Sequence, residues 1–210
     1  NVGMICKRYI WAIPNGYEKL RGINFVKELI LETPFISYPK KNTRSGIFEE
    51  SLQNPIERMG INDDHFYCFP CYVGEYLAFV FVHRDYLTHG VSLANLFQIA
   101  TEHEVSGKKP DLIYIFGANN HSEHPEDGFF HDQQNDIMVG FVSHHDAYDY
   151  FGYMKKMMLT LHNVRQIHHG NLPIHGAMVH IILKGGKEAN VVMMGDSGAG
   201  KSERIEAFRA

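Results

Sequence analysis

Short apolar runs rich in β-forming residues recur along the chain and predict the strands of a sheet. Three of these runs are continuously apolar, as is typical of buried strands, and they lie at 76–82, 112–116 and 137–142. Weaker patterns predict further strands at 8–13, 174–183 and 189–194. The last two strands flank a short turn rich in glycine and lysine, so together they predict a hairpin.

Stretches with apolar residues at helical spacing lie between these strands and predict helices at 23–31, 92–103 and 146–164. In the last and longest of them, Met154, Met157 and Met158 fall on one face, which predicts a buried side of the helix. The polar stretches at 35–46 and 118–136 are expected to be loops. Strands interleaved with helices predict an α/β fold with a mixed sheet.

The chain has 210 residues, of which 44% are apolar, so it is long enough for one large domain and part of another. A break at 170–173 suggests a division into an N-terminal α/β domain at 1–168 and the start of a nucleotide-binding domain at 169–210. Only eight residues follow Ser202, fewer than a phosphate-binding domain normally needs. We therefore expect a fragment of a longer enzyme, inactive by itself.

The net charge of −4 gives no reason to expect nucleic acid or an anionic membrane as a partner. No apolar run reaches the roughly 18–20 residues of a membrane span, and the first residues do not resemble a secretory signal. Three cysteines, a low and odd number, are typical of a reducing compartment. These features predict a soluble cytoplasmic protein.

The clearest motif is a phosphate-binding loop at 195–202, where the chain has the pattern Gly-x-x-x-x-Gly-Lys-Ser. Its glycines allow backbone N–H groups to point at a phosphate, and Lys201 adds a positive charge beside the terminal phosphates. The Ser202 hydroxyl is expected to bind a Mg²⁺ ion carried by the nucleotide. The residues predicted to bind the nucleotide are Gly195, Asp196, Ser197, Gly198, Ala199, Gly200, Lys201 and Ser202.

A second motif precedes this loop. The stretch 150–156 reads Tyr-Phe-Gly-Tyr-Met-Lys-Lys, and His175 follows Lys156 by nineteen residues. This arrangement resembles the ATP-dependent phosphoenolpyruvate carboxykinases, and the resemblance covers about residues 133–205. It implies that Lys156 and His175 bind Mn²⁺, that Tyr150 contacts the substrate, and that Lys156, His175 and Lys201 are catalytic.

The resemblance also implies the reaction: a lyase of gluconeogenesis that converts oxaloacetate into phosphoenolpyruvate and CO₂ at the expense of a nucleotide such as ATP. The phosphoryl donor stays open between ATP, GTP and pyrophosphate. A lysine binds a metal ion only as the neutral amine, so the ion must displace its proton, whereas neutral imidazole is a common ligand. The alternatives are a solvated helix face for Lys156 and a structural histidine for His175.

Some residues depart from the carboxykinase pattern. Gly176-Ala177 stand where that family has Cys-Ser, and Glu203 stands where it has a second Thr. The family's early Arg-Ser-Pro-Lys-Asp stretch has only Arg44-Ser45-Gly46 as a counterpart. HPr kinase/phosphorylase, a protein kinase, has both a His-Gly pair and a Gly-Lys-Ser-Glu ending, so it is the alternative. A non-catalytic nucleotide-binding sensor is a third interpretation.

Two other groups of residues suggest chemistry less strongly. Cys68 and Cys71 form a CxxC pair, but no second pair stands at zinc-site spacing, so we interpret them as two buried thiols. His121, His124 and His131 fall in one acidic stretch, which we interpret as a solvated loop rather than a metal site.

Overall fold

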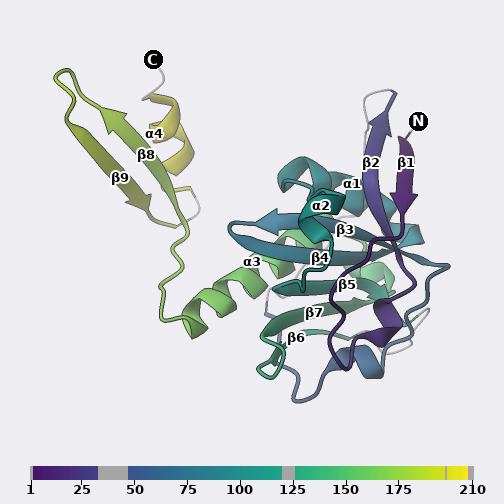
Figure 1. Ribbon diagram of the computed structural model, residues 1–210. Helices are drawn as coiled ribbons and strands as arrows, with labels where there is room; N and C mark the ends of the chain where they lie inside the picture. Colours follow the sequence, from purple (N-terminus) through teal and green to yellow (C-terminus); the bar gives the residue numbers. More distant parts are fainter. Residues whose placement is uncertain (1, 33–46, 120–125, 197, 208–210) are drawn as a thin grey trace. The chain divides into compact units, whose positions relative to one another are not determined.

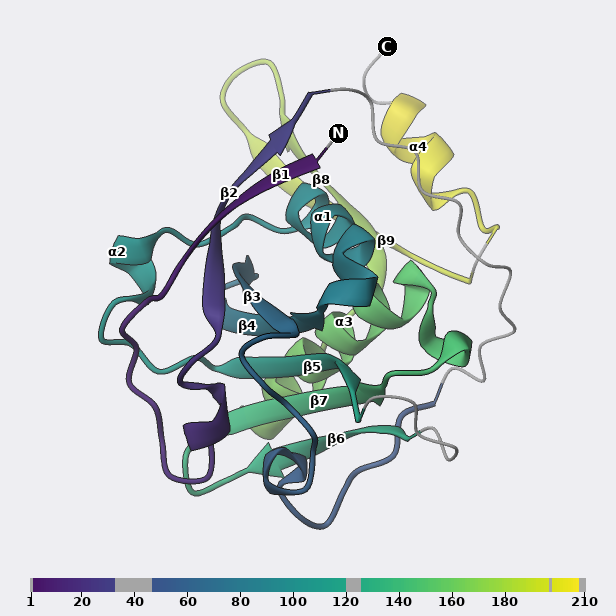
Figure 2. The same cartoon turned by 90° about the vertical axis from the view of Figure 1, so that its right-hand side faces the viewer.

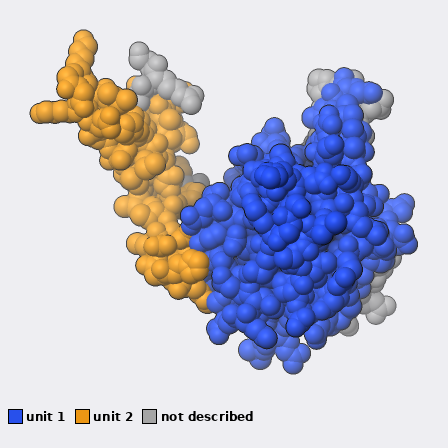
Figure 3. Space-filling view, in the orientation of Figure 1, with its two compact units in different colours: residues 1–165 blue, residues 166–210 orange. Residues whose placement is uncertain are grey.

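The computed structural model describes residues 2–32, 47–119, 126–196 and 198–207, and it has an α/β fold with a mixed sheet. The chain divides into two compact units, unit 1 at Asn1–Arg165 and unit 2 at Gln166–Ala210 (Figure 3). This division lies three residues before the end of the N-terminal domain that the sequence suggests. None of the helices in the described ranges is long and apolar enough to cross a membrane.

Unit 1 is built on a seven-stranded sheet with the order β1-β2-β3-β4-β5-β7-β6 (Figure 1). Its strands are β1 (Val2–Lys7), β2 (Asn24–Leu31), β3 (Phe66–Val73), β4 (Tyr76–His83), β5 (Leu112–Ala118), β6 (Asp127–Asp132) and β7 (Ile137–Ser143). Strands β4, β5 and β7 are parallel to one another, and β2 is parallel to β3. The other neighbours pair antiparallel. The three parallel strands are the three continuously apolar runs, whose prediction is confirmed.

Each of these three strands is buried along its whole length because the sheet separates two hydrophobic cores. In β4, Ala78 and Val80 lie in one core while Leu77 and Phe79 lie in the other. This alternation follows from the two-residue period of a strand. A strand buried on both faces must therefore be apolar at every position.

Helices α1 (Leu87–Leu96) and α3 (Phe151–His168) cover the first of these cores (Figure 2). Met154, Met157 and Met158 of α3 are buried, as their spacing predicts. A Cβ at Gly140 of β7 would lie 2.6 Å from Cγ of Met157, so glycine is needed where α3 approaches the sheet. A 3₁₀ turn, η4 (Asp146–Tyr148), precedes α3, so the α-helix starts five residues later than predicted.

The N-terminal segment covers the second core, and two predictions fail there. The predicted strand at 8–13 is irregular: the Trp11 ring packs edge-on against Phe79 with 5.1 Å between centroids. The predicted helix at 23–31 is strand β2, because it pairs with β1 on one side and with β3 on the other. Pairing with distant segments outweighs a helical spacing over so few residues.

Other element boundaries also differ from the prediction. The helix predicted at 92–103 is interrupted, because Tyr72 N–H donates to Gln98 O and draws this segment to the edge of β3. A separate turn, α2 (Glu102–Val105), follows, with Thr101 and Glu104 forming a capping box. The predicted loop at 118–136 contains β6, which pairs antiparallel with β7.

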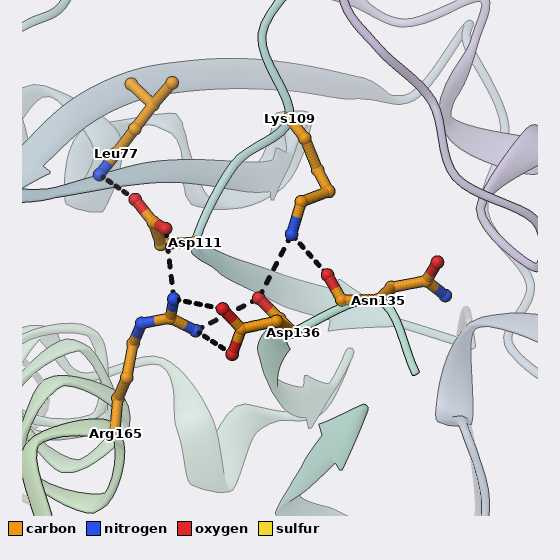
Figure 4. Close-up of polar contacts among 6 residues, drawn as sticks. All are labelled: Leu77, Lys109, Asp111, Asn135, Asp136 and Arg165. Carbon is orange, nitrogen blue, oxygen red and sulfur yellow. Dashed lines mark hydrogen bonds and ion pairs between the residues drawn. The ribbon is translucent and has the colours of Figure 1, made fainter. Parts of the chain in front are cut away.

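Arg165 ties α3 to the amino ends of β5 and β7 (Figure 4). Its guanidinium donates to both carboxylate oxygens of Asp136, at 3.0 and 2.8 Å, and to Asp111 Oδ1 at 3.2 Å. The same group lies 4.9 Å from the centroid of the Tyr76 ring. Arg165 is only 5% exposed, so the two carboxylates compensate a charge removed from water.

Unit 2 contains the hairpin of β8 (Gly176–Ile182) and β9 (Glu188–Met194) and the short helix α4 (Lys201–Ala207). The two strands pair antiparallel from Gly176 opposite Met194 to Ile182 opposite Glu188, which confirms the predicted hairpin. Helix α4 contacts β8. The hairpin's far end is a turn with positive φ angles at Gly185 and Gly186.

Candidate functional site

The phosphate-loop motif connects a strand to a helix, as its sequence predicts. Strand β9 ends at Met194 and α4 begins at Lys201. Between them, Gly198 and Gly200 have φ angles of 84° and 76°, in the left-handed region that favours glycine. Ser197 lies outside the described residues.

The loop is closed tightly upon itself. Ala199 N–H donates to Asp196 O at 3.1 Å, and a Cβ at Gly195 would lie 2.9 Å from Cβ of Ala199. The Lys201 ammonium donates to the carbonyl oxygens of Gly195 and Asp196, at 2.7 and 2.8 Å. The charge of Lys201 is therefore held over the loop, where an anion bound by the loop would meet it.

His175 belongs to the same site because of the hairpin's register. It immediately precedes β8, and Gly195 immediately follows β9, while Gly176 and Met194 pair between them. His175 and the loop consequently line one cleft of about 610 Å³. The other residues that line the cleft are Gly195, Asp196, Gly198, Gly200, Lys201, Ser202 and Glu203.

The ligand atoms of this cleft fit a Mg²⁺ or Mn²⁺ ion that is also bound by phosphate. They fit less well an ion that protein ligands alone would surround. Ser202 offers a hydroxyl oxygen and His175 a ring nitrogen, types of ligand that such ions accept. Among the described residues of unit 2, no three His, Cys, Asp or Glu side chains converge on one point. Phosphate oxygens would have to complete the coordination, as is usual for Mg²⁺.

Lys156 and Tyr150 lie in unit 1. Lys156 projects from α3 with its ammonium 5.4 Å from the centroid of the Phe48 ring. Its charge lowers the pKa of Asp127, although burial outweighs it and leaves that pKa above its usual value. The Tyr150 ring packs over Gly152, where a Cβ would lie 2.1 Å from Cε1 of the ring. Because Lys156 and His175 belong to different units, their shared metal ion stays a prediction.

Of the weaker candidates, Arg44, His121 and His124 lie outside the described residues, whereas His131 lies on β6. Cys68 and Cys71 are both buried on β3 without a disulfide. They contribute to opposite cores, as residues three apart on a strand must. This excludes a shared metal ion or redox pair, and burial raises the pKa of the Cys71 thiol to about 12.

A second group of polar residues, which the sequence does not predict, lies at the carboxyl ends of the parallel strands. His83 ends β4, His144 follows β7, and Asp85 lies two residues after His83. Asp85 Oδ2 is 2.9 Å from His144 Nε2 and 3.5 Å from His83 Nδ1. Burial and the neighbouring His144 lower the pKa of His83 to about 4. The available signal was a histidine within two residues of the end of two apolar runs, His83 after 76–82 and His144 after 137–142.

Comparisons with protein-family models, with curated proteins and with solved structures found no match.

Proposed function

We propose that unit 2 binds the phosphates of a nucleoside triphosphate at residues 195–202. One observation carries the proposal: the loop stands between a strand and a helix, with Lys201 held over it by two loop carbonyls. The positive φ angles of Gly198 and Gly200 are those that let successive N–H groups face one anion.

The reaction that these residues support best is a phosphoenolpyruvate carboxykinase-like one. Oxaloacetate loses CO₂, and the enolate oxygen attacks the γ-phosphate, so that phosphoenolpyruvate, CO₂ and the nucleoside diphosphate leave. Lys201 would stabilise the charge on the transferred group, and Tyr150 would contact the substrate. A divalent ion held by Lys156 and His175 would supply further positive charge at the reacting oxygens. The placement of His175 in the phosphate cleft agrees with this assignment, and the Tyr-x-Gly-x-Met-Lys-Lys stretch at 150–156 favours it over a protein kinase.

A protein-kinase function like that of HPr kinase/phosphorylase is the second candidate, and one observation favours it. Glu203, which departs from the carboxykinase pattern and matches the kinase pattern, lines the same cleft as His175. The two functions differ in what they require of Lys156. A carboxykinase needs its amine at the metal ion, whereas the kinase pattern has no counterpart of the Tyr-x-Gly-x-Met-Lys-Lys stretch.

Nucleotide binding is tested by titrating the 210-residue chain with a fluorescent ATP analogue in Mg²⁺. We expect Lys201→Ala to weaken binding at least tenfold, while Lys187→Ala, a control in the turn of the hairpin, leaves it unchanged. Equal binding by wild type and Lys201→Ala would refute the phosphate site.

The reaction class is tested with Mn²⁺, whose binding in the presence of ATP is followed by electron paramagnetic resonance. The carboxykinase assignment predicts weaker Mn²⁺ binding in both Lys156→Ala and His175→Ala, but not in Lys155→Ala, whose side chain is the adjacent exposed lysine. If only His175→Ala weakens Mn²⁺ binding, the carboxykinase assignment is wrong and the kinase-like alternative gains.

A further inference from the structure

The carboxyl ends of the parallel strands in unit 1 bring together side chains that the proposed reaction does not use. In open α/β sheets this edge is where ligands usually bind. Strand β4 contributes His83, the turn after it contributes Asp85, and the residue after β7 is His144. Strand β5 lies between β4 and β7, so the cluster bridges three adjacent strands.

The ligating atoms of this cluster have the spacing of a metal site. Asp85 Oδ2 lies 2.9 Å from one imidazole nitrogen and 3.5 Å from the other, and all three atoms lie within 4.8 Å of one another. Ligands about 2.0–2.1 Å from a tetrahedral ion stand about 3.3 Å apart. The two distances to Asp85 lie on either side of that value. Among the described residues, this is the only group of three such side chains that converges in this way.

Two acceptor atoms of the cluster, His83 Nδ1 and Asp85 Oδ2, stand close together. His83 Nδ1 accepts the backbone N–H of Asp85 at 3.3 Å, so this nitrogen carries the lone pair and the ring proton lies on Nε2. The same Nδ1 stands 3.5 Å from the Asp85 carboxylate, which is also an acceptor. Two acceptors at this distance repel each other. A bound cation would remove this repulsion, and the Nδ1 lone pair would then bind the ion in place of the long hydrogen bond from the Asp85 N–H.

The buried half of His83 gives a second, independent observation. The His83 side chain is only 4% exposed, and its Nε2 has no hydrogen-bond partner among the described residues. His83 also lines a cavity of about 190 Å³ with His65 and Asn62, large enough to hold water. Histidines that bind a metal ion usually donate their other N–H to water or to an acceptor, and this cavity provides the room.

The backbone beside the cluster is adapted to its close packing. Gly117 of β5 has a φ angle of 94°, and a Cβ there would lie 2.8 Å from the Cβ of His83. The absence of a side chain therefore lets His83 stand against β5. The opposite side of the cluster is open, since the Asp85 side chain is 55% exposed.

We propose that His83, Asp85 and His144 form a binding site for one divalent transition-metal ion of the Zn²⁺ type. Two imidazoles and one carboxylate favour Zn²⁺, Co²⁺ or Ni²⁺ over Mg²⁺ and Ca²⁺, which prefer all-oxygen sites. The ligands would be His83 Nδ1, His144 Nε2 and Asp85 Oδ2, with the fourth position facing solvent. The site lies in unit 1 and requires no nucleotide.

The experiment titrates the chelator-treated, nucleotide-free chain with Co²⁺ and follows the visible d–d absorption, with Zn²⁺ as the competitor. We expect one saturable four-coordinate site that Zn²⁺ displaces. His144→Asn and Asp85→Asn each change a partly exposed side chain and should weaken binding at least tenfold. The controls His103→Asn and Asp64→Asn change exposed residues outside the cluster and should bind as wild type. Circular dichroism verifies that each variant is folded.

Four results would overturn the proposal: no saturable binding by the wild type, wild-type affinity in either cluster variant, equal weakening in the controls, or loss of binding in His175→Asn. The last variant also separates this site from the phosphate cleft. A chain that binds Co²⁺ at His83, Asp85 and His144 but fails to bind ATP would retain this site while refuting the proposed function.

Discussion

Replacing Arg165 by methionine tests how much the ion pairs between α3 and the sheet stabilise unit 1. Methionine has a similar length and no charge, so it removes the guanidinium's bonds to Asp136 and Asp111 while filling much of its space. Asp111 also accepts the Leu77 N–H at 2.9 Å, so it keeps one partner. Asp136 loses three hydrogen bonds from Arg165, one of them to its carbonyl oxygen.

The expected cost lies between two known limits. Breaking a fully buried ion pair costs about 3–5 kcal/mol, and losing an exposed pair costs about 0–1 kcal/mol. The Arg165 side chain is 6% exposed, but the carboxylates of Asp111 and Asp136 are 32% and 58% exposed and recover water. We therefore expect the free energy of unfolding to fall by about 2–3 kcal/mol. For a unit of this size that corresponds to roughly 5–10 °C in Tm.

Urea denaturation of the chain, followed by far-UV circular dichroism, measures this change as a shift of the midpoint at constant slope. Arg84→Met is the matched control, since its side chain is exposed and should change the free energy of unfolding by less than about 0.5 kcal/mol. A loss below about 0.5 kcal/mol in Arg165→Met would show that the network contributes nothing net.

Three further predictions follow from particular contacts. Gly140→Ala places a Cβ 2.6 Å from Met157 Cγ, so overpacking should lower the free energy of unfolding by about 1–3 kcal/mol, measured by urea denaturation. Burial lowers the pKa of His89 in the folded protein below its unfolded value of about 6.5. The stability that the neutral imidazole contributes is therefore present above pH 6.5 and is lost as the pH falls from there through the lower, folded pKa. Urea midpoints should therefore fall between pH 7 and pH 5, and His89→Gln should flatten this dependence; an unchanged slope would contradict the assignment. Gly198→Ala forces a side chain into φ 84°, although its Cβ would meet no described atom beyond its chain neighbours within 4 Å. Backbone strain of about 1–2 kcal/mol should therefore reduce the affinity for the ATP analogue, and unchanged affinity would mean that this φ is not needed.

The parts of the fold that the sequence predicted are those whose signal is local. Strands β4, β5 and β7 are apolar at every position because both faces are buried, and no other element of unit 1 leaves so direct a pattern. The local pattern of β2 predicts a helix, because the burial of this strand depends on β1 and on β3, which lies more than thirty residues further along the chain. Its half-exposed outer end carries no strand periodicity of its own.

The two candidate sites also differ in how local their sequence signal is. The phosphate loop was found because its eight residues are contiguous and their backbone requirements are encoded in the glycines. The sequence does not reveal the cluster of His83, Asp85 and His144, because His144 lies 59 residues after Asp85 and meets the other two only through the order of β4, β5 and β7. That order depends on which strands pair, and the sequence of a single strand does not specify its neighbour.

The buried cysteines of β3 are natural reporters of how unit 1 opens. Cys68 and Cys71 lie in opposite cores, so each thiol reacts with a reagent only when its own side of the sheet is exposed. Equal rates of modification would mean that both sides open together, by unfolding of the whole unit. A faster rate at one thiol would reveal a partial opening confined to that side of the sheet. The two thiols of β3 thus allow the cooperativity between the two sides of the sheet to be measured in the wild-type protein.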